Sequence, residues 1–163
     1  MNLSVREFKA QEFRSLKNIS YPMSSLDVFV GANGVGKTNL YRSLELLQSA
    51  AANTLARDLA SEGGLESAMW AGRRRRGEPA CIRLAVGLAD PVGRHPSDSL
   101  YRYEVEIGFP QPLSATLGSE PQIKAETLTY TGAGRSSRLM TETVLWLWHA
   151  ARTAGQPGSP WTC

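Results

Sequence analysis

The feature that most constrains this chain is the eight-residue run Gly31-Ala32-Asn33-Gly34-Val35-Gly36-Lys37-Thr38. It matches the phosphate-cradling pattern G-x-x-x-x-G-K-[ST] at every fixed position. A loop of this kind needs a strand before it and a helix after it, because loop amides and the helix N-terminus together surround an anion. The run therefore predicts an α/β fold of the P-loop NTPase class.

Each fixed position of the run has a physical role. Glycines let the backbone turn sharply and approach an anion without a Cβ in the way. Lys37 can reach the β and γ phosphates of a nucleotide, which makes it the expected catalytic residue, and the Thr38 hydroxyl suits Mg²⁺. The expected cofactors are ATP and Mg²⁺. The expected contacts within the run are Gly31, Asn33, Gly34, Val35, Gly36, Lys37 and Thr38.

The sequence around the run supports this placement. Leu26–Val30 is a short β-rich stretch and is the expected strand into the loop. From Lys37, apolar residues recur every three or four positions, which predicts one long helix from about Lys37 to Ala60. The pair Gly63-Gly64 then supplies a stop signal.

The rest of the chain alternates as strands do. Strands are expected near residues 3–9 and 16–19, and later at Ala80–Leu88, Ser99–Phe109 and Ile123–Tyr130, with prolines in the gaps. This order predicts an antiparallel meander after one β-loop-α unit. Residues 1–140 are expected to form the nucleotide-binding lobe, and residues 141–163 a short helix over Thr141–Ala151 followed by a frayed tail.

Composition narrows the class of protein. The 163 residues are 42% hydrophobic and 20% charged, with a net charge of +3, which is not the profile of a disordered chain. No apolar stretch is long enough to span a bilayer, and the N-terminus lacks the apolar core of a signal peptide. We therefore expect a cytoplasmic protein that has no membrane partner.

Three segments together resemble a known family. They are Phe13-Arg14-Ser15-Leu16-Lys17-Asn18-Ile19, the loop Gly-Ala-Asn-Gly-Val-Gly-Lys-Thr-Asn-Leu that begins at Gly31, and Gly63-Gly64-Leu65-Glu66 with Trp70. Over about residues 1–130 the chain resembles the N-terminal part of RecF/SMC-like ATPases, which are ABC-type proteins often described as AAA family ATPases.

The resemblance implies an ABC-type first lobe, in which a P-loop and its helix join antiparallel strands. It also implies that Arg14 and Ser15 lie beside the nucleotide. Asn39, which follows the loop in the matched segment, completes the expected set of nucleotide contacts. In a complete protein of this kind, two heads dimerise around ATP.

Departures from the family pattern are equally informative. An apolar strand ending in Asp-Glu, which would bind Mg²⁺ and activate water, is not found after the loop. The nearest candidate ends at Asp90, but Pro91 follows where Glu is expected. A signature segment similar to Leu-Ser-Gly-Gly is also missing. The chain therefore resembles a first lobe without its second, and the fold is expected to be incomplete.

Four adjacent arginines follow the Trp70 segment: Arg73, Arg74, Arg75 and Arg76. Such a run can neutralise phosphates of nucleic acid, and the resembling proteins carry an arginine-bearing loop near here. A solvated loop is the alternative, because no stacking aromatics are interleaved with these arginines.

Two hypotheses of different classes follow. The first is an ATP-binding P-loop domain of an ATPase, whose hydrolysis requires the missing second lobe. The second is a nucleotide-binding or interaction fragment without turnover, which includes contact with nucleic acid. A GTPase is disfavoured, because the sequence contains no Asn-Lys-x-Asp segment to read guanine.

Overall fold

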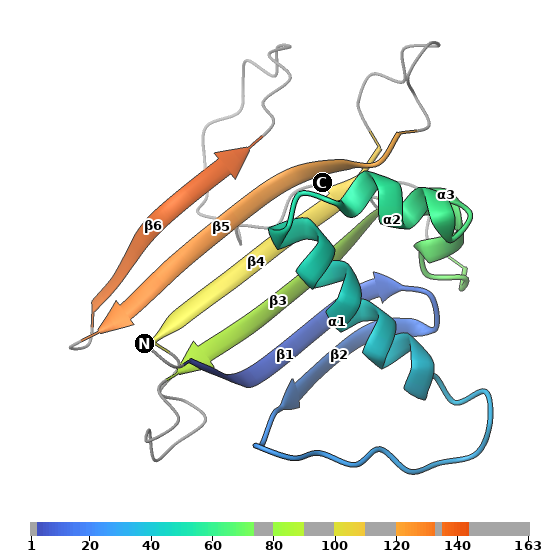
Figure 1. The fold of residues 1–163 in the computed structure, drawn as a ribbon, viewed down its shortest axis with the longest axis horizontal. Coiled ribbons are helices and arrows are strands. Elements are labelled where there is room, and N and C mark those ends of the chain that lie inside the picture. Colours follow the sequence, from blue (N-terminus) through green and yellow to red (C-terminus); the bar gives the residue numbers. More distant parts are fainter. Residues whose placement is uncertain (1–2, 74–79, 90–99, 110–119, 133–134, 144–163) are drawn as a thin grey trace.

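The computed structural model of the chain describes residues 3–73, 80–89, 100–109, 120–132 and 135–143. These residues form one sheet with a layer of helices on one of its faces (Figure 1). In chain order the elements are β1 Ser4–Phe13, β2 Leu16–Pro22, α1 Lys37–Ala51, α2 Leu55–Ser61, α3 Gly64–Ala68, β3 Cys81–Ala89, β4 Tyr101–Gly108, β5 Gln122–Gly132 and β6 Arg135–Thr143.

The sheet has six strands in the order β2-β1-β3-β4-β5-β6, and every neighbouring pair is antiparallel. The strands expected near residues 3–9 and 16–19 are present as the β1–β2 hairpin. The three later strands are present as β3, β4 and β5, so the antiparallel meander is confirmed. β6 extends it, and its last residues 141–143 lie where the sequence suggested a helix. The remainder of that expected helix lies outside the described residues.

The core lies between the sheet and the helices. Phe8 of β1, Leu84 of β3 and Ile107 of β4 are each at most 1% exposed, and they share a cluster with Leu46 and Leu47 of α1. Alternation along the strands places one set of side chains against the helices and the other on the opposite face. The opposite face of β3 and β4 is also buried in places, because Cys81, Ala85 and Glu106 are at most 5% exposed.

The expected long helix from Lys37 to Ala60 is wrong, because the helix ends at Ala51. Asn53 adopts a left-handed φ of 57°, and the N–H of Thr54 donates to the carbonyl oxygen of Ser49 at 2.9 Å, which closes the helix end. Asn tolerates this conformation better than most residues. The chain then turns, so that Leu55 and Leu59 of α2 are buried in the core.

The strand expected at Leu26–Val30 is also wrong. This segment has no regular secondary structure, and it belongs to the loop that leaves the edge strand β2 and returns at the start of α1 (Figure 1). Leu26, Val28 and Val30 are 81%, 76% and 91% exposed. A strand needs a neighbour for its backbone groups. In the part of the chain that the structure describes, the six strands of the sheet do not include this segment.

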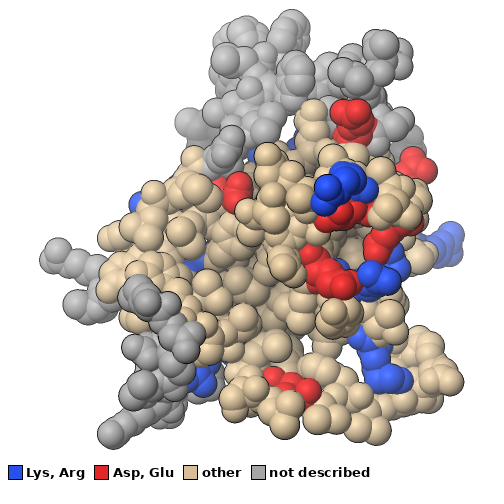
Figure 2. Space-filling model, in the orientation of Figure 1, with Lys and Arg blue, Asp and Glu red and all other residues tan. Residues whose placement is uncertain are grey.

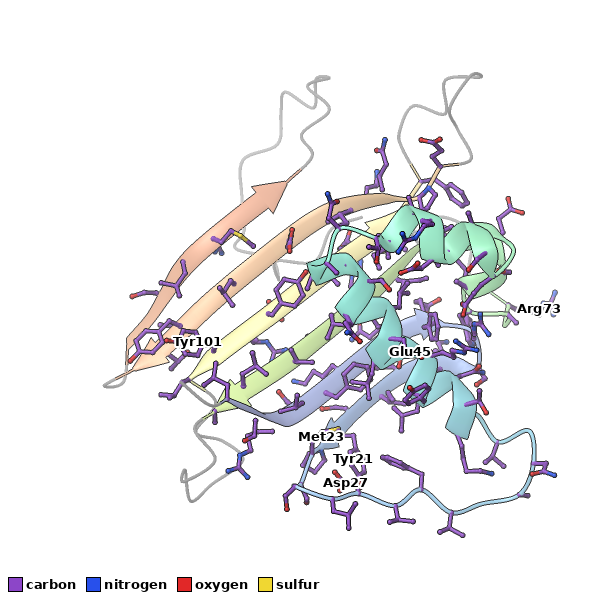
Figure 3. All side chains as sticks on the ribbon, in the orientation of Figure 1. Tyr21, Met23, Asp27, Glu45, Arg73 and Tyr101 are labelled. Atoms are coloured by element: carbon purple, nitrogen blue, oxygen red, sulfur yellow. The ribbon has the colours of Figure 1, made fainter. Side chains whose placement is uncertain are left out.

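A few local contacts shape that segment. The carboxylate of Asp27 accepts a hydrogen bond from the N–H of Ser24 at 2.8 Å and another from the Tyr21 hydroxyl at 3.4 Å. The rings of Tyr21 and Phe29 lie 5.0 Å apart between centroids. Figure 3 shows Tyr21, Met23 and Asp27 together at this corner of the molecule. The corner is therefore anchored, while the apolar residues beyond it stay exposed.

Candidate P-loop site

The run at residues 31–38 forms the loop directly before α1. Residues 31–35 are exposed, and the helix begins at Lys37, with the carbonyl oxygen of Gly36 accepting the N–H of Leu40 at 3.0 Å. Gly34 and Gly36 have φ values of 87° and 100°, in the region that favours glycine. These two glycines let the chain turn through the loop and enter the helix at once.

The side chain of Lys37 folds back over its own loop. Its Nζ donates hydrogen bonds to the carbonyl oxygens of Gly31 at 2.6 Å and of Ala32 at 2.7 Å. The ammonium group therefore lies across the mouth of the loop, where the motif would place the phosphates of a nucleotide.

The surroundings of the two glycines differ. A Cβ placed on Gly34 would meet nothing within 4 Å, so space is open above the loop at this position. A Cβ on Gly36 would lie 2.8 Å from the Oγ of Ser15. Gly36 is therefore required both by its backbone conformation and by the close approach of the β1–β2 turn.

The β1–β2 turn packs against the P-loop. The side-chain amide of Asn39, in the first turn of α1, donates a hydrogen bond to Ser15 Oγ at 2.8 Å. The structure thus brings Ser15 and Asn39, two of the residues expected near a nucleotide, together beside Gly36. The hydrophobic pattern of the sequence carried no signal for this contact.

Arg14 occupies the turn one residue earlier, and its side chain contacts an acidic residue. Its Nη2 donates to Glu62 Oε2 at 2.6 Å, and Arg42 Nη1 lies 3.3 Å from the other oxygen of Glu62. Arg42 also contacts Glu45 Oε2 at 2.9 Å. Sequence reasoning did not single out Glu62, Arg42 or Glu45, because their roles depend on how the helices fold back onto the hairpin.

The turn is also fixed on its other side. The N–H of Arg14 donates to the carbonyl oxygen of Ala68 at 2.9 Å, and its own carbonyl oxygen accepts the N–H of Ala71 at 3.0 Å. The ammonium group of Lys17 lies 4.6 Å from the ring centroid of Trp70. The hairpin turn is therefore held between the P-loop and the segment that leads to Arg73.

Acidic and basic side chains lie next to one another over the helical side of the molecule, whereas much of the same view carries neither (Figure 2). A polar cavity of about 420 Å³ opens there, beside α1, and is lined by Arg42, Glu45, Ser49, Asp58 and Glu62 among others. Hydrogen bonds from Ser49 and Thr54 lower the pKa of Asp58. This cavity borders the cluster of charges, but P-loop residues do not line it.

Other sequence candidates are only partly described. Asp90 and Arg74–Arg76 lie outside the described residues, while Arg73 lies at the end of the segment that follows Trp70 (Figure 3). Glu104 forms an ion pair with Arg102 at 2.7 Å. Since its neighbour Val105 is buried in the core that α1 covers, Glu104 points to the opposite face of the sheet, away from the P-loop helix.

Neither a metal-binding cluster nor a membrane-spanning helix is found among the described residues. No cluster of three or more His, Cys, Asp or Glu side chains could hold a metal ion there. No helix among the described residues is both long enough and apolar enough to cross a membrane.

Comparison with protein families places the chain. A family model described as "AAA domain, putative AbiEii toxin, Type IV TA system" matches residues 28–143, well over half of the chain. The chain belongs to this family of AAA domains. No curated protein matches the chain. The match begins just before the P-loop and runs through β6, so it covers the loop, the helices and the antiparallel meander, and it confirms the P-loop NTPase class.

Proposed function

We propose that this AAA domain binds Mg·ATP at residues 31–38. The observation that supports this most is the geometry of the loop: two left-handed glycines directly before α1, and a lysine whose Nζ lies 2.6 and 2.7 Å from two loop carbonyls. The space above Gly34 leaves the loop accessible to a phosphate group, because a Cβ there would meet nothing within 4 Å.

The chain's own residues would divide the binding between them. The N–H groups from Gly34 to Thr38 and the N-terminus of α1 bind phosphate oxygens. Lys37 exchanges its two loop carbonyls for the β and γ phosphates. The hydroxyl of Thr38 would hold Mg²⁺, which would lower the negative charge that the protein must neutralise. Gly31, Asn33, Val35 and Asn39 shape the loop and its exit.

We propose further that the domain is the first lobe of an ABC-type, RecF/SMC-like head. The exposed apolar side chains of Leu26, Val28 and Val30 support this view, because an exposed apolar surface is suited to contact with another part of a protein. A second lobe that covers this segment would bring the missing carboxylates to the P-loop. The signature segment would come from a second head in a head-to-head dimer.

The alternative is a nucleotide-binding or interaction module without turnover, and it shares the binding step. Contact with nucleic acid through Arg73–Arg76 remains a prediction in either case. Its supporting observation is a pair of backbone hydrogen bonds, from the N–H of Arg14 to the carbonyl oxygen of Ala68 and from the N–H of Ala71 to the carbonyl oxygen of Arg14, which ties the start of this segment to the turn beside the P-loop.

Titration calorimetry with Mg·ATP tests the proposal. Charged hydrogen bonds contribute about 1.5 to 3 kcal/mol, so Lys37→Ala should weaken binding by about ten-fold to hundred-fold. Lys17→Ala is the matched control, since it removes the same charge from the neighbouring hairpin. Equal affinity in wild type and Lys37→Ala, or no saturable binding in wild type, would contradict the proposal that Mg·ATP binds at residues 31–38.

A further inference from the structure

We infer that Glu62 competes with a bound nucleotide for the guanidinium of Arg14. In the absence of nucleotide, Glu62 forms an ion pair with the Arg14 guanidinium. When nucleotide binds, the guanidinium leaves Glu62 and binds a phosphate group instead. The inference rests on the proposed function, because it requires an anion at residues 31–38. It goes beyond that function by assigning a role to a carboxylate that no sequence motif includes.

The backbone at Arg14 is fixed next to the P-loop. The residue has a φ of 48°, which is uncommon outside glycine, and the N–H and carbonyl oxygen both make backbone hydrogen bonds to the 68–71 segment. The next residue, Ser15, touches Gly36 and Asn39. A change in Arg14 must therefore occur in its side chain, which is anchored one residue away from the phosphate cradle.

The present partner of that side chain is only partly shielded. The Arg14 and Glu62 side chains are 27% and 28% exposed, so water screens their ion pair. An ion pair of this kind is weak enough to exchange for a phosphate group, which offers more charge and more acceptor oxygens.

Glu62 would not be left without a counter-ion by this exchange. Arg42 Nη1 already lies 3.3 Å from its other carboxylate oxygen, and Glu45 holds Arg42 in place at 2.9 Å. The backbone of Glu62 is fixed as well, because its N–H donates to Leu59 and its carbonyl oxygen accepts the Ser67 hydroxyl at 2.8 Å. The carboxylate can therefore release Arg14 at little cost.

The Arg14 guanidinium also has an unused donor. Its Nε is buried and finds no acceptor among the described residues. A buried donor without a partner is unfavourable, so the arrangement with Glu62 does not satisfy this side chain fully. A tetrahedral phosphate group, with several oxygens, is the kind of acceptor that could satisfy two guanidinium donors at once.

Binding measurements on four variants test the inference. Mg·ATP affinity is measured by titration calorimetry for wild type, Glu62→Gln, Arg14→Gln and the double variant, after circular dichroism has shown that each is folded. Glu62→Gln should tighten binding by about two- to five-fold, the fold-change that corresponds to a partly exposed ion pair. In the Arg14→Gln background the same change should have no effect beyond that of the control.

Glu66→Gln is the matched control, because it removes an exposed carboxylate of α3 for which the described residues show no ion pair with Arg14 or Arg42. It reports how much the loss of a nearby negative charge favours an anionic ligand in general. Glu62→Asp, which keeps the charge, should bind as wild type does. If Glu62→Gln tightens binding equally in both Arg14 backgrounds, or not at all, the inference is overturned.

A second measurement uses the unaltered protein. The Nε–Hε resonance of Arg14, assigned from its disappearance in Arg14→Lys, should shift when Mg·ATP is added. No shift under saturating nucleotide overturns the inference even if the Glu62 variants fail to fold. The two hypotheses remain distinguishable: binding that depends on Lys37 but leaves Arg14 unchanged refutes only the role of Glu62, whereas no binding that depends on Lys37 refutes both.

Discussion

Asn39 donates a hydrogen bond from its side-chain amide to Ser15 Oγ at 2.8 Å, across 24 positions of sequence. This contact joins the β1–β2 turn to the first turn of the P-loop helix. The same turn also forms backbone hydrogen bonds to residues 68–71 through Arg14. The first turn of α1 and residues 68–71 are thus coupled through one hairpin turn.

Gly36→Ala should lower the free energy of unfolding more than Gly34→Ala. Both positions have a φ near 90°, which costs an L-residue about 1 to 3 kcal/mol, but only a Cβ at Gly36 would meet Ser15 Oγ. Urea unfolding of both variants measures the difference. Adding Ser15→Ala to Gly36→Ala should recover part of the loss. Equal losses at the two glycines would show that the turn does not approach the loop as described.

Leu59→Ala should destabilise the fold by about 2 to 5 kcal/mol, because Leu59 is 1% exposed in the core and the truncation leaves a cavity. Leu26→Ala makes the same chemical change at a side chain that is 81% exposed, and it should change the free energy of unfolding by less than about 0.5 kcal/mol. The comparison can be made by urea unfolding. A large cost at Leu26 would mean that the segment before the P-loop is buried in solution.

Glu7→Gln should reduce stability in a pH-dependent way. Burial raises the pKa of Glu7, but hydrogen bonds and charge from Lys9 and Arg102, at 3.1 and 2.9 Å, outweigh it and lower that pKa overall. A carboxyl with a lowered pKa stabilises the fold above its unfolded pKa, and this contribution disappears as pH falls through the folded value.

The expected deficit of Glu7→Gln near neutral pH is about 0.2 to 1 kcal/mol, since the side chain is 30% exposed. It should shrink toward zero below the usual carboxyl range. Urea unfolding of wild type and variant at several pH values down to the acid limit of folding tests the sign. A deficit that is constant with pH would show that the loss is one of packing rather than charge.

This chain alone should hydrolyse ATP at the level of a Lys37→Ala control, even if it binds ATP. Phosphoryl transfer requires a positioned water and stabilised charge, and the loop with its lysine supplies only part of that. Steady-state phosphate release by purified protein is the measurement. Turnover that vanishes in Lys37→Ala would reveal a catalytic carboxylate, and Asp90 would be the first to replace, since Glu104 lies on the face of the sheet away from α1.

By itself, the sequence determined the features that depend on neighbouring residues, namely the P-loop and the strands. The glycines of residues 31–38 specify the loop, since few other residues can adopt the backbone seen at Gly34 and Gly36, and alternation within Ala80–Leu88, Ser99–Phe109 and Ile123–Tyr130 predicts strands. The spacing of apolar residues gave the wrong helix end near Asn53. Apolar residues continue to recur every three or four positions beyond this point, although the left-handed conformation of Asn53 ends the helix.

Only the tertiary structure decided which elements meet. The run Leu26–Val30 has the composition of a strand, but pairing depends on a neighbour, and among the described residues the sheet is built from other segments. The contacts of Ser15 with Asn39 and of Arg14 with Glu62 join positions 24 and 48 residues apart. Their residue types are ordinary at every one of those positions, so no local pattern marks them. They arise because the helices fold back over the hairpin to bury the apolar side chains that both present.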